Sequence, residues 1–143
     1  MTSEQQIETR HIVVADDEAH IGRIIKIKLE QGPFRVSLAF DGQEAIDVLE
    51  RENGADLVVL DLMMPRLSGF DVLDHIRSRP EWRNIPCIIL TAAGEEKYEQ
   101  DAREGGATEF LTKPFSPKKL YNLIAKLTGV TSEENVEIPE DAD

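Results

Sequence analysis

Short apolar runs alternate with longer segments of helical periodicity along most of this chain. Continuous apolar runs of four to six residues are typical of strands buried on both faces, and apolar residues repeating every three or four positions indicate amphipathic helices. This alternation predicts an α/β fold in which a doubly wound, five-stranded parallel sheet carries helices on both faces. The predicted strands are His11 to Ala15, Arg35 to Ala39, Leu57 to Leu60, Cys87 to Thr91 and Glu109 to Leu111.

The last predicted helix has the clearest amphipathic pattern. Ser116 is its expected cap, Pro117 occupies the first turn and Gly129 closes it. Its apolar stripe follows the spacing i, i+3, i+4 and i+7, at Leu120, Leu123, Ile124 and Leu127. The other predicted helices are Ala19 to Gln31, Gly42 to Glu52, Gly69 to Arg79 and Glu95 to Glu104.

Two of these helices differ in the apolar face they offer. The first should bury a stripe that contains Ile21, Ile24, Ile25 and Leu29. The fourth offers little more than Tyr98 and Ala102. Because helices in proteins depend on burial of an apolar face, we expect the fourth helix to be weakly anchored.

Length and charge predict a single domain with polar ends. We expect a polar N-terminal extension over 1–10, one domain over 11–128 and an acidic, disordered tail over 129–143. Half of the net charge of −12 falls in that tail, and the acidic excess argues against a direct nucleic-acid or membrane partner. The single cysteine, Cys87, and the lack of a signal-peptide pattern favour a cytoplasmic protein.

Reactive side chains follow the predicted strands. Asp16 and Asp17 follow the first strand, Asp61 the third and Lys113 the fifth, while Thr91 ends the fourth. In open parallel sheets, ligand sites lie beyond the carboxyl ends of the strands, so these five side chains should meet there. Three carboxylates about 4 Å apart would repel by roughly 4 kcal/mol per pair at an effective dielectric of about 20. A bound Mg²⁺ would offset that repulsion, since it prefers a few oxygen ligands together with water and phosphate oxygens.

The same side chains suit the formation of an aspartyl phosphate. A carboxylate can attack a phosphoryl group whose oxygens are neutralised by a metal ion and an ammonium group. The Thr91 hydroxyl adds a hydrogen-bond donor for those oxygens. Lys113, the lysine of this set, would supply the ammonium group.

Four motifs in this order resemble the CheY-like receiver domains of response regulators, over about residues 12–127. They are Asp16-Asp17, Leu60-Asp61-Leu62-Met63-Met64-Pro65 with Gly69, Leu90-Thr91-Ala92, and Phe110-Leu111-Thr112-Lys113-Pro114-Phe115. The resemblance implies a flavodoxin-like strand order of 2-1-3-4-5 and phosphorylation of Asp61 by a histidine kinase or a histidine phosphotransfer protein. It also implies direct Mg²⁺ ligation by Asp17, Asp61 and the Met63 carbonyl oxygen, with Asp16 acting through water, and a cis bond before Pro114.

The resemblance further implies a switch. Thr91 would move toward the phosphoryl group and Phe110 would turn inward, changing a protein-binding face formed by the fourth helix, fifth strand and last helix. Arg66, Ser68 and Gly105-Gly106 depart from the common pattern, which affects loop conformation. Met63 and Ala93 flank the site with apolar side chains that cannot orient an attacking water, so we expect slow self-dephosphorylation.

Single residues of the set, and the site as a whole, also have other interpretations. Alone, Asp16 or Asp17 could merely cap a helix, and Phe110 could be only a core residue. An aspartate-based phosphatase would carry a second carboxylate where Met63 stands, and a flavin carrier would offer a hydroxyl-rich loop where the acidic pair lies. A scaffold that has lost phosphorylation would lack one of the key residues.

The remaining expectations concern output and assembly. We expect a signalling module rather than an enzyme, a monomer or weak homodimer, that acts without an output domain; the alternative is a receiver piece of a larger DNA-binding or enzymatic regulator. His11, His20 and His75 should be surface or helix-end residues, and Cys87 a buried apolar one. Trp82 lies in the predicted loop after the third helix and has no functional interpretation.

Overall fold

The computed structural model describes residues 8–130, which contain one parallel sheet. Every neighbouring pair of its strands is parallel, and the order is 2-1-3-4-5, which confirms the predicted fold class and topology. The strands are β1 (Arg10–Ala15), β2 (Phe34–Ala39), β3 (Leu57–Asp61), β4 (Cys87–Ala92) and β5 (Glu109–Lys113).

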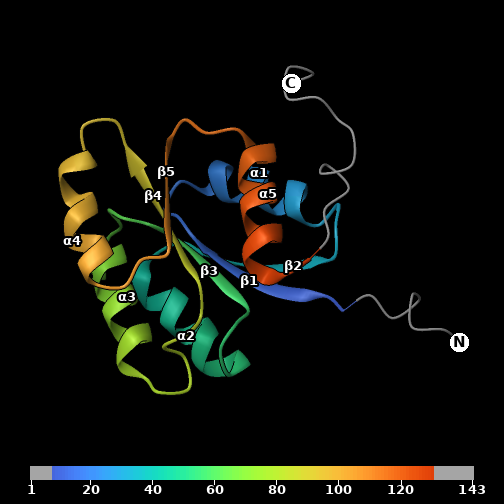
Figure 1. Ribbon diagram of the computed structural model, residues 1–143, viewed down its shortest axis with the longest axis horizontal. Helices are drawn as coiled ribbons and strands as arrows, with labels where there is room; N and C mark the ends of the chain where they lie inside the picture. The colour runs from blue at the N-terminus through green and yellow to red at the C-terminus, as the bar shows by residue number, and fades with distance from the viewer. Residues whose placement is uncertain (1–7, 131–143) are drawn as a thin grey trace, which may run out of the picture.

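Helices cover both faces of the sheet, which makes three layers (Figure 1). One face is covered by α1 and α5, the other by α2, α3 and α4. Their bounds are α1 (Ala19–Leu29), α2 (Gly42–Glu52), α3 (Gly69–Ser78), α4 (Glu99–Glu104) and α5 (Pro117–Thr128).

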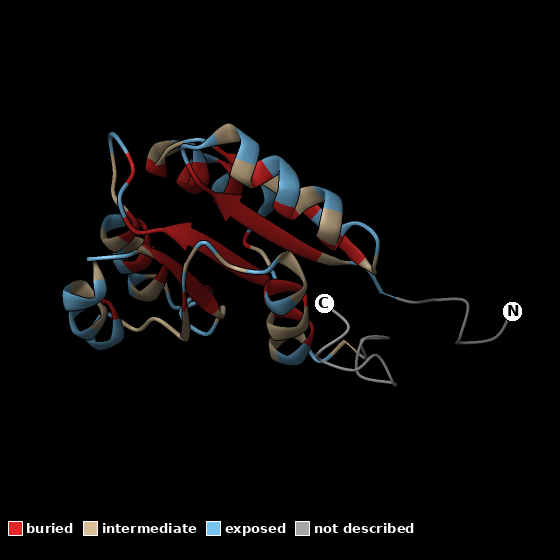
Figure 2. Ribbon diagram, turned by 90° about the horizontal axis from the view of Figure 1, so that it is seen from above, coloured by how far each residue is buried: buried red, intermediate tan, exposed pale blue. Residues whose placement is uncertain are grey.

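The central strands β1, β3 and β4 are mostly apolar because both of their faces are buried. In β1, Val13 and Ala15 pack under α2 and α3, while Ile12 and Val14 pack under α1 and α5. This is the period-2 alternation of a strand, with an apolar residue needed at every position. Figure 2 shows the result as buried strands between helices whose outer faces are exposed.

Capping side chains fix the helices on the functional side of the sheet. The Ser116 hydroxyl accepts a hydrogen bond from the Lys119 amide at 3.2 Å, and Gly129 closes α5 with a φ of 76°, as predicted. Ser68 caps α3 and forms a reciprocal capping box with Asp71. Ser68 therefore has a structural task at the position where the chain departs from its relatives.

The ends of the described chain differ from the predicted boundaries. Arg10 was expected in a polar extension, but it is the first residue of β1 and pairs with Phe34. The rest of the predicted extension before residue 8 and the predicted acidic tail after residue 130 lie outside the described residues. Gly129 and Val130 are described, and Val130 packs against the core beneath α5.

Two helices also differ in detail. The prediction that Ile24 is buried is wrong, since 47% of its surface is exposed, and α1 ends at Leu29 rather than Gln31. The predicted fourth helix is split into a 3₁₀ turn (Glu96–Tyr98) and α4. In α4 only Ala102 is fully buried. A short helix with one buried side chain has little packing to hold it, as expected from its sequence.

Trp82, which was placed in a loop, and His11, which was expected at the surface or a helix end, are both buried. Trp82 is only 2% exposed and belongs to the core beneath α2 and α3, and the guanidinium of Arg79 lies 3.9 Å above its ring centroid. His11 is 7% exposed, and its ring bonds the Ser37 hydroxyl at 2.8 Å. Burial, followed by the charge of Arg35, lowers the pKa of His11. Cys87 is buried as predicted, and burial raises its pKa to about 11.

Among the described helices, none is both long and apolar enough to cross a lipid bilayer.

Candidate functional site

The predicted reactive residues meet at the carboxyl edge of the sheet. Asp16 and Asp17 follow β1, and Asp61 is the last residue of β3. One carboxylate oxygen from each of these three residues lies within 4.8 Å of the others. Thr91 and Lys113 lie on the neighbouring strands β4 and β5, inside the strands rather than beyond them.

Backbone packing fixes the loop that follows Asp61. Gly69 opens α3 so close to β3 that a Cβ atom there would lie 2.6 Å from the Asp61 carbonyl oxygen. Only glycine fits this contact. Arg66, in the same loop, has a φ of 71°, in the left-handed region that favours glycine. The departure at Arg66 is therefore accommodated as a strained residue, and its side chain lies 3.4 Å from the Asp41 carboxylate.

Lys113 is the cation of the site. Its ammonium nitrogen lies 2.9 Å from Asp16 Oδ2, 3.3 Å from Asp61 Oδ2 and 2.9 Å from Glu18 Oε1. Burial opposes the charged form of Lys113, but hydrogen bonds to Asp16 and Glu18 and the charge of Asp61 outweigh it and raise its pKa. Lys113 is therefore a permanent positive charge at this edge. The bond between Lys113 and Pro114 is cis, as the resemblance implied.

Asp61 has a perturbed carboxyl group. Burial is the main cause that raises its pKa to about 7, with the negative charge of Asp16 adding to it and Lys113 opposing it. Strongly perturbed carboxylates in a polar cluster are typical of functional sites. Without a second cation, the combined negative charge of Asp16, Asp17 and Asp61 exceeds the single positive charge of Lys113.

The cluster has the donor set of a magnesium site. Asp16 is fully buried, yet its Oδ2 receives no hydrogen bond of acceptable geometry from the described residues. All the side-chain donors are carboxylate oxygens, which suit Mg²⁺, and no histidine or cysteine lies in the cluster. Asp16, Asp17 and Asp61 thus fit the predicted ion. Met63, whose carbonyl oxygen was the fourth expected ligand, lies two residues after Asp61 and is 41% exposed.

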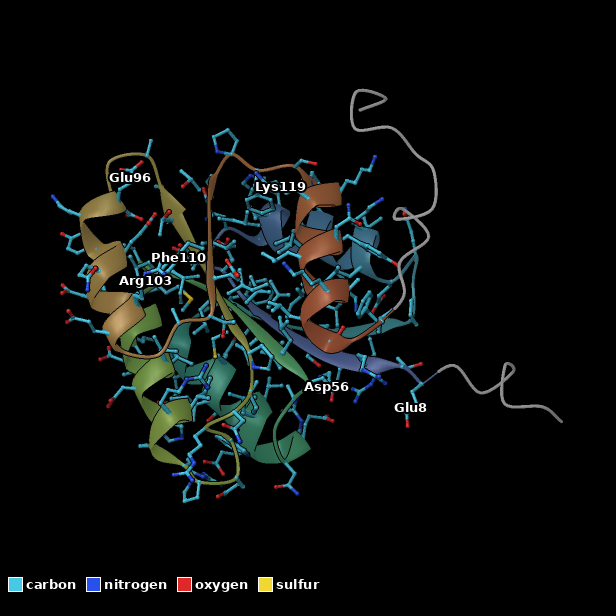
Figure 3. All side chains as sticks on the ribbon, in the orientation of Figure 1. Glu8, Asp56, Glu96, Arg103, Phe110 and Lys119 are labelled. Atoms are coloured by element: carbon cyan, nitrogen blue, oxygen red, sulfur yellow. The ribbon has the colours of Figure 1, made fainter. Side chains whose placement is uncertain are left out.

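The two expected switch residues lie on the neighbouring strands β4 and β5, where Thr91 is paired with Thr112 and Phe110 with Ile89. Thr91 is fully buried, and its Oγ1 lies 3.4 Å from Thr112 Oγ1. Phe110 is half-buried, and Figure 3 shows its ring next to the Arg103 side chain from α4. The guanidinium carbon of Arg103 lies 4.6 Å from the ring centroid.

One residue at the site was missed by sequence reasoning. Glu18 follows the acidic pair directly and contacts Lys113 as closely as Asp16 does. A third acidic residue in the same loop was the available signal. That signal was not used, because an acidic residue just before a helix usually stabilises the positive end of the helix dipole.

Two grooves flank this edge. One, of about 540 Å³, lies between α1 and the segment after β5, and its lining is mainly apolar: Glu18, Ile21, Ile24, Ile25, Ala92, Lys113, Pro114, Phe115 and Pro117. The other, of about 510 Å³, lies between β5 and α5 and includes Phe110, Lys119 and Lys126.

Known proteins share both the sequence and the fold. A family profile described as the response regulator receiver domain matches residues 12–125. The transcriptional regulatory protein SrrA of Staphylococcus aureus is 36% identical over 132 residues, which cover 92% of this chain and 53% of SrrA. The chain thus spans about half the length of the curated relatives it matches.

Solved structures agree. The receiver domain of Francisella response regulator 1452 is 35% identical with a TM-score of 0.75, covering 85% of this chain and 98% of that one. CheY4 of Vibrio cholerae is 25% identical with a TM-score of 0.77, covering 83% and 98%. The receiver domain of the Pseudomonas aeruginosa sensor histidine kinase PA1611, described with a magnesium ion in its active-site cleft, is 26% identical with a TM-score of 0.76, covering 85% and 98%. This chain therefore belongs to the response regulator receiver domain family.

Proposed function

We propose that Asp61 accepts a phosphoryl group from a phosphohistidine on a histidine kinase or a histidine phosphotransfer protein. The observation that carries this proposal is the contact between the Asp61 carboxylate and the Lys113 ammonium, 3.3 Å apart, within a cluster of acids at the carboxyl edge of the sheet. A nucleophile, a charge for the phosphoryl oxygens and a metal-binding set are thereby combined.

The transfer is a displacement at phosphorus. An Asp61 carboxylate oxygen forms the new bond to phosphorus while the bond from phosphorus to the histidine nitrogen breaks, and that electron pair stays on the imidazole. The attacking carboxylate must be ionised, and Lys113 favours the ionised form against the effect of burial. Lys113 and the Thr91 hydroxyl would then hold the phosphoryl oxygens.

Asp17, Asp61 and the Met63 carbonyl oxygen would bind Mg²⁺ directly, with Asp16 bound through water. When bound, the ion supplies positive charge that offsets the repulsion among the carboxylates and the phosphoryl oxygens. Among the residues that the structure describes, Lys113 is the one cation within 4 Å of the Asp61 carboxylate.

The partner that donates the phosphoryl group must bring its histidine to Asp61. The apolar groove beside α1 opens next to the site, and the exposed Ile24 lines it. An apolar surface of this kind next to a reactive carboxylate suits a protein donor. We place the docking of the kinase or phosphotransfer protein there.

The signal would leave through the face formed by α4, β5 and α5. Phosphorylation would draw the Thr91 hydroxyl toward the phosphoryl group and allow the Phe110 ring to turn inward. Phe110 lines the groove between β5 and α5, so this movement would change the shape of that groove. A downstream protein that binds this face would then distinguish the two states.

The proposed protein is a phosphoacceptor module in the cytoplasm and a monomer or weak homodimer. It would lose the phosphoryl group slowly and would not turn over an external substrate. That it works without an output domain stays a prediction, because the chain spans about half the length of its curated relatives. The downstream reading frame decides that point.

Acetyl phosphate tests the central step without any partner protein. With Mg²⁺, the protein should gain the mass of one phosphoryl group on Asp61. The variant Asp61→Asn should gain none, and Asp74→Asn, which removes an exposed acid on α3, should gain it normally. No mass gain in the unmodified protein would contradict the proposal and favour a scaffold that is not phosphorylated.

A further inference from the structure

Glu18 lies at the start of α1 but does not serve that helix with its side chain. It occupies the N-cap position, where no side-chain cap hydrogen bond is formed. Its own amide instead donates to Asp16 Oδ1 at 2.9 Å, which fixes the loop. The Glu18 carboxylate points to Lys113 and lies 2.9 Å from its ammonium nitrogen.

Lys113 donates hydrogen bonds to Glu18 and Asp61, and Asp16 Oδ2 forms an ion pair with the same nitrogen without an acceptable hydrogen-bond geometry. A lysine ammonium has three N–H donors and no acceptor. Asp16, Glu18 and Asp61 each place one carboxylate oxygen within 3.3 Å of the nitrogen. The lysine side chain is only 16% exposed, so water has little access to it. A phosphoryl oxygen that reaches Lys113 therefore competes with these three carboxylates for a crowded ammonium group.

Glu18 is the partner that leaves at the lowest cost. The Asp16 side chain is fully buried and that of Asp61 is 10% exposed, whereas that of Glu18 is 51% exposed. A released Glu18 carboxylate would be hydrated at once, while the two aspartates would be left as buried charges without a partner.

We propose that Glu18 is a positioning residue that holds Lys113 in the unphosphorylated protein and yields it to the phosphoryl group on Asp61. This rests on the proposed function of Asp61. Glu18 favours the unphosphorylated state in two ways. It competes with the phosphoryl group for the ammonium group of Lys113, and its negative charge repels the phosphoryl oxygens. It thereby sets how readily the receiver is activated.

The size of the effect is bounded by the exposure of the pair. Exposed ion pairs change an equilibrium by up to about fivefold. Replacing Glu18 with glutamine keeps the shape and removes the charge, and it leaves the N-cap backbone intact because no side-chain cap bond is lost. The matched control is Asp74→Asn, which removes one exposed acid on α3.

The first experiment tests whether Glu18 holds the lysine, without phosphorylation. The protein is acetylated briefly with N-hydroxysuccinimide acetate, and modification of Lys113 is measured by peptide mass spectrometry relative to the exposed Lys119 (Figure 3). Glu18→Gln should raise the relative rate at Lys113 severalfold, because the ammonium loses the charged partner that covers it. An unchanged rate would overturn the proposal.

The second experiment tests whether Glu18 yields the lysine. Beryllofluoride, which binds an aspartate as a phosphoryl mimic, is titrated with Mg²⁺ and followed by amide NMR signals. Glu18→Gln should bind it about two- to fivefold more tightly than the unmodified protein, and Asp74→Asn should not. Equal affinities of Glu18→Gln and the unmodified protein would overturn the proposal. If the unmodified protein itself binds no beryllofluoride and gains no phosphoryl mass, the function of Asp61 fails instead.

Discussion

The guanidinium of Arg103 covers the ring of Phe110, with its central carbon 4.6 Å from the ring centroid (Figure 3). Arg103 lies on α4, whose only fully buried residue is Ala102, and Phe110 lies on β5. The contact therefore joins the weakest helix of the fold to the proposed switch residue. The Phe110 ring makes this contact with Arg103 in its present position and would lose it on turning inward. The contact therefore favours the unphosphorylated state.

The first prediction concerns this contact. Arg103→Gln should increase beryllofluoride affinity about two- to fivefold, because an exposed cation–π contact contributes roughly 0.5–1 kcal/mol and would be lost only from the inactive state. The measurement is a titration with Mg²⁺ present. Arg83→Gln, which removes an exposed positive charge in the loop before β4, is the control and should leave the affinity unchanged. Equal affinities for Arg103→Gln and the unmodified protein would show that the contact does not bias the switch.

The second prediction uses the pKa of Asp61. Because the folded state raises this pKa to about 7, the ionised carboxylate destabilises the metal-free fold above pH 7. The penalty shrinks as the pH falls through 7 and disappears below about 4, where the group is protonated in both states. Asp61→Asn removes the charge, so it should stabilise the metal-free protein at pH 8 by up to about 4 kcal/mol, at roughly 1.4 kcal/mol per pKa unit.

Urea unfolding in the presence of a chelator measures this difference. The gain in unfolding free energy from Asp61→Asn should be largest at pH 8 and much smaller at pH 5. The Asp74→Asn variant carries the same change of net charge on an exposed helix position and should show no such trend. A gain that is constant with pH would mean that Asp61 is not the group whose charge opposes folding.

The fold was predictable because its pattern is redundant. The central strands are buried on both faces, so every residue of β1 from Ile12 to Ala15 is apolar, and a short run suffices to identify it. The site was predictable for a related reason. Topology alone brings the residues after β1 and β3 together, so the positions of Asp16 and Asp61 in the chain imply their meeting.

What sequence reasoning missed are contacts between side chains from separate segments. Trp82 lies in a polar stretch, and its burial depends on Arg79 covering one side of the ring and on a glycine, Gly54, approaching the indole nitrogen. His11 stands beside an apolar run and was assigned to the surface by its polarity, yet Ser37 on β2 gives it a buried partner. Glu18 likewise acquires its role only from Lys113, 95 residues away. No local pattern records such pairs.

The third prediction concerns the metal. Mg²⁺ should raise the thermal unfolding midpoint of the unmodified protein, because a ligand that binds only the folded state stabilises it, by about 1.4 kcal/mol at ten times its Kd. Asp17→Asn should abolish most of this shift, since it removes an exposed ligand of the acidic cluster without disturbing a buried ion pair. Asp74→Asn is again the control. A full Mg²⁺ shift in Asp17→Asn would contradict the proposed ligand set.

The last prediction concerns the lifetime of the phosphoryl group. Met63 is 41% exposed beside Asp61, and Ala93 is exposed just after β4. Neither side chain can donate or accept a hydrogen bond that would orient a water for attack on phosphorus, so loss of the phosphoryl group should be slow, with a half-life well beyond seconds. Met63→Asn adds an amide next to the site without emptying a buried space. One oriented hydrogen bond contributes about 0.5–1.5 kcal/mol, so this variant should lose the phosphoryl group about two- to tenfold faster. The rate is measured by intact mass after acetyl phosphate is removed, and Met63→Leu should keep the slow rate because it adds no polar group. A half-life of seconds in the unmodified protein, or equal rates for Met63→Asn and Met63→Leu, would show that these two positions do not control access of water.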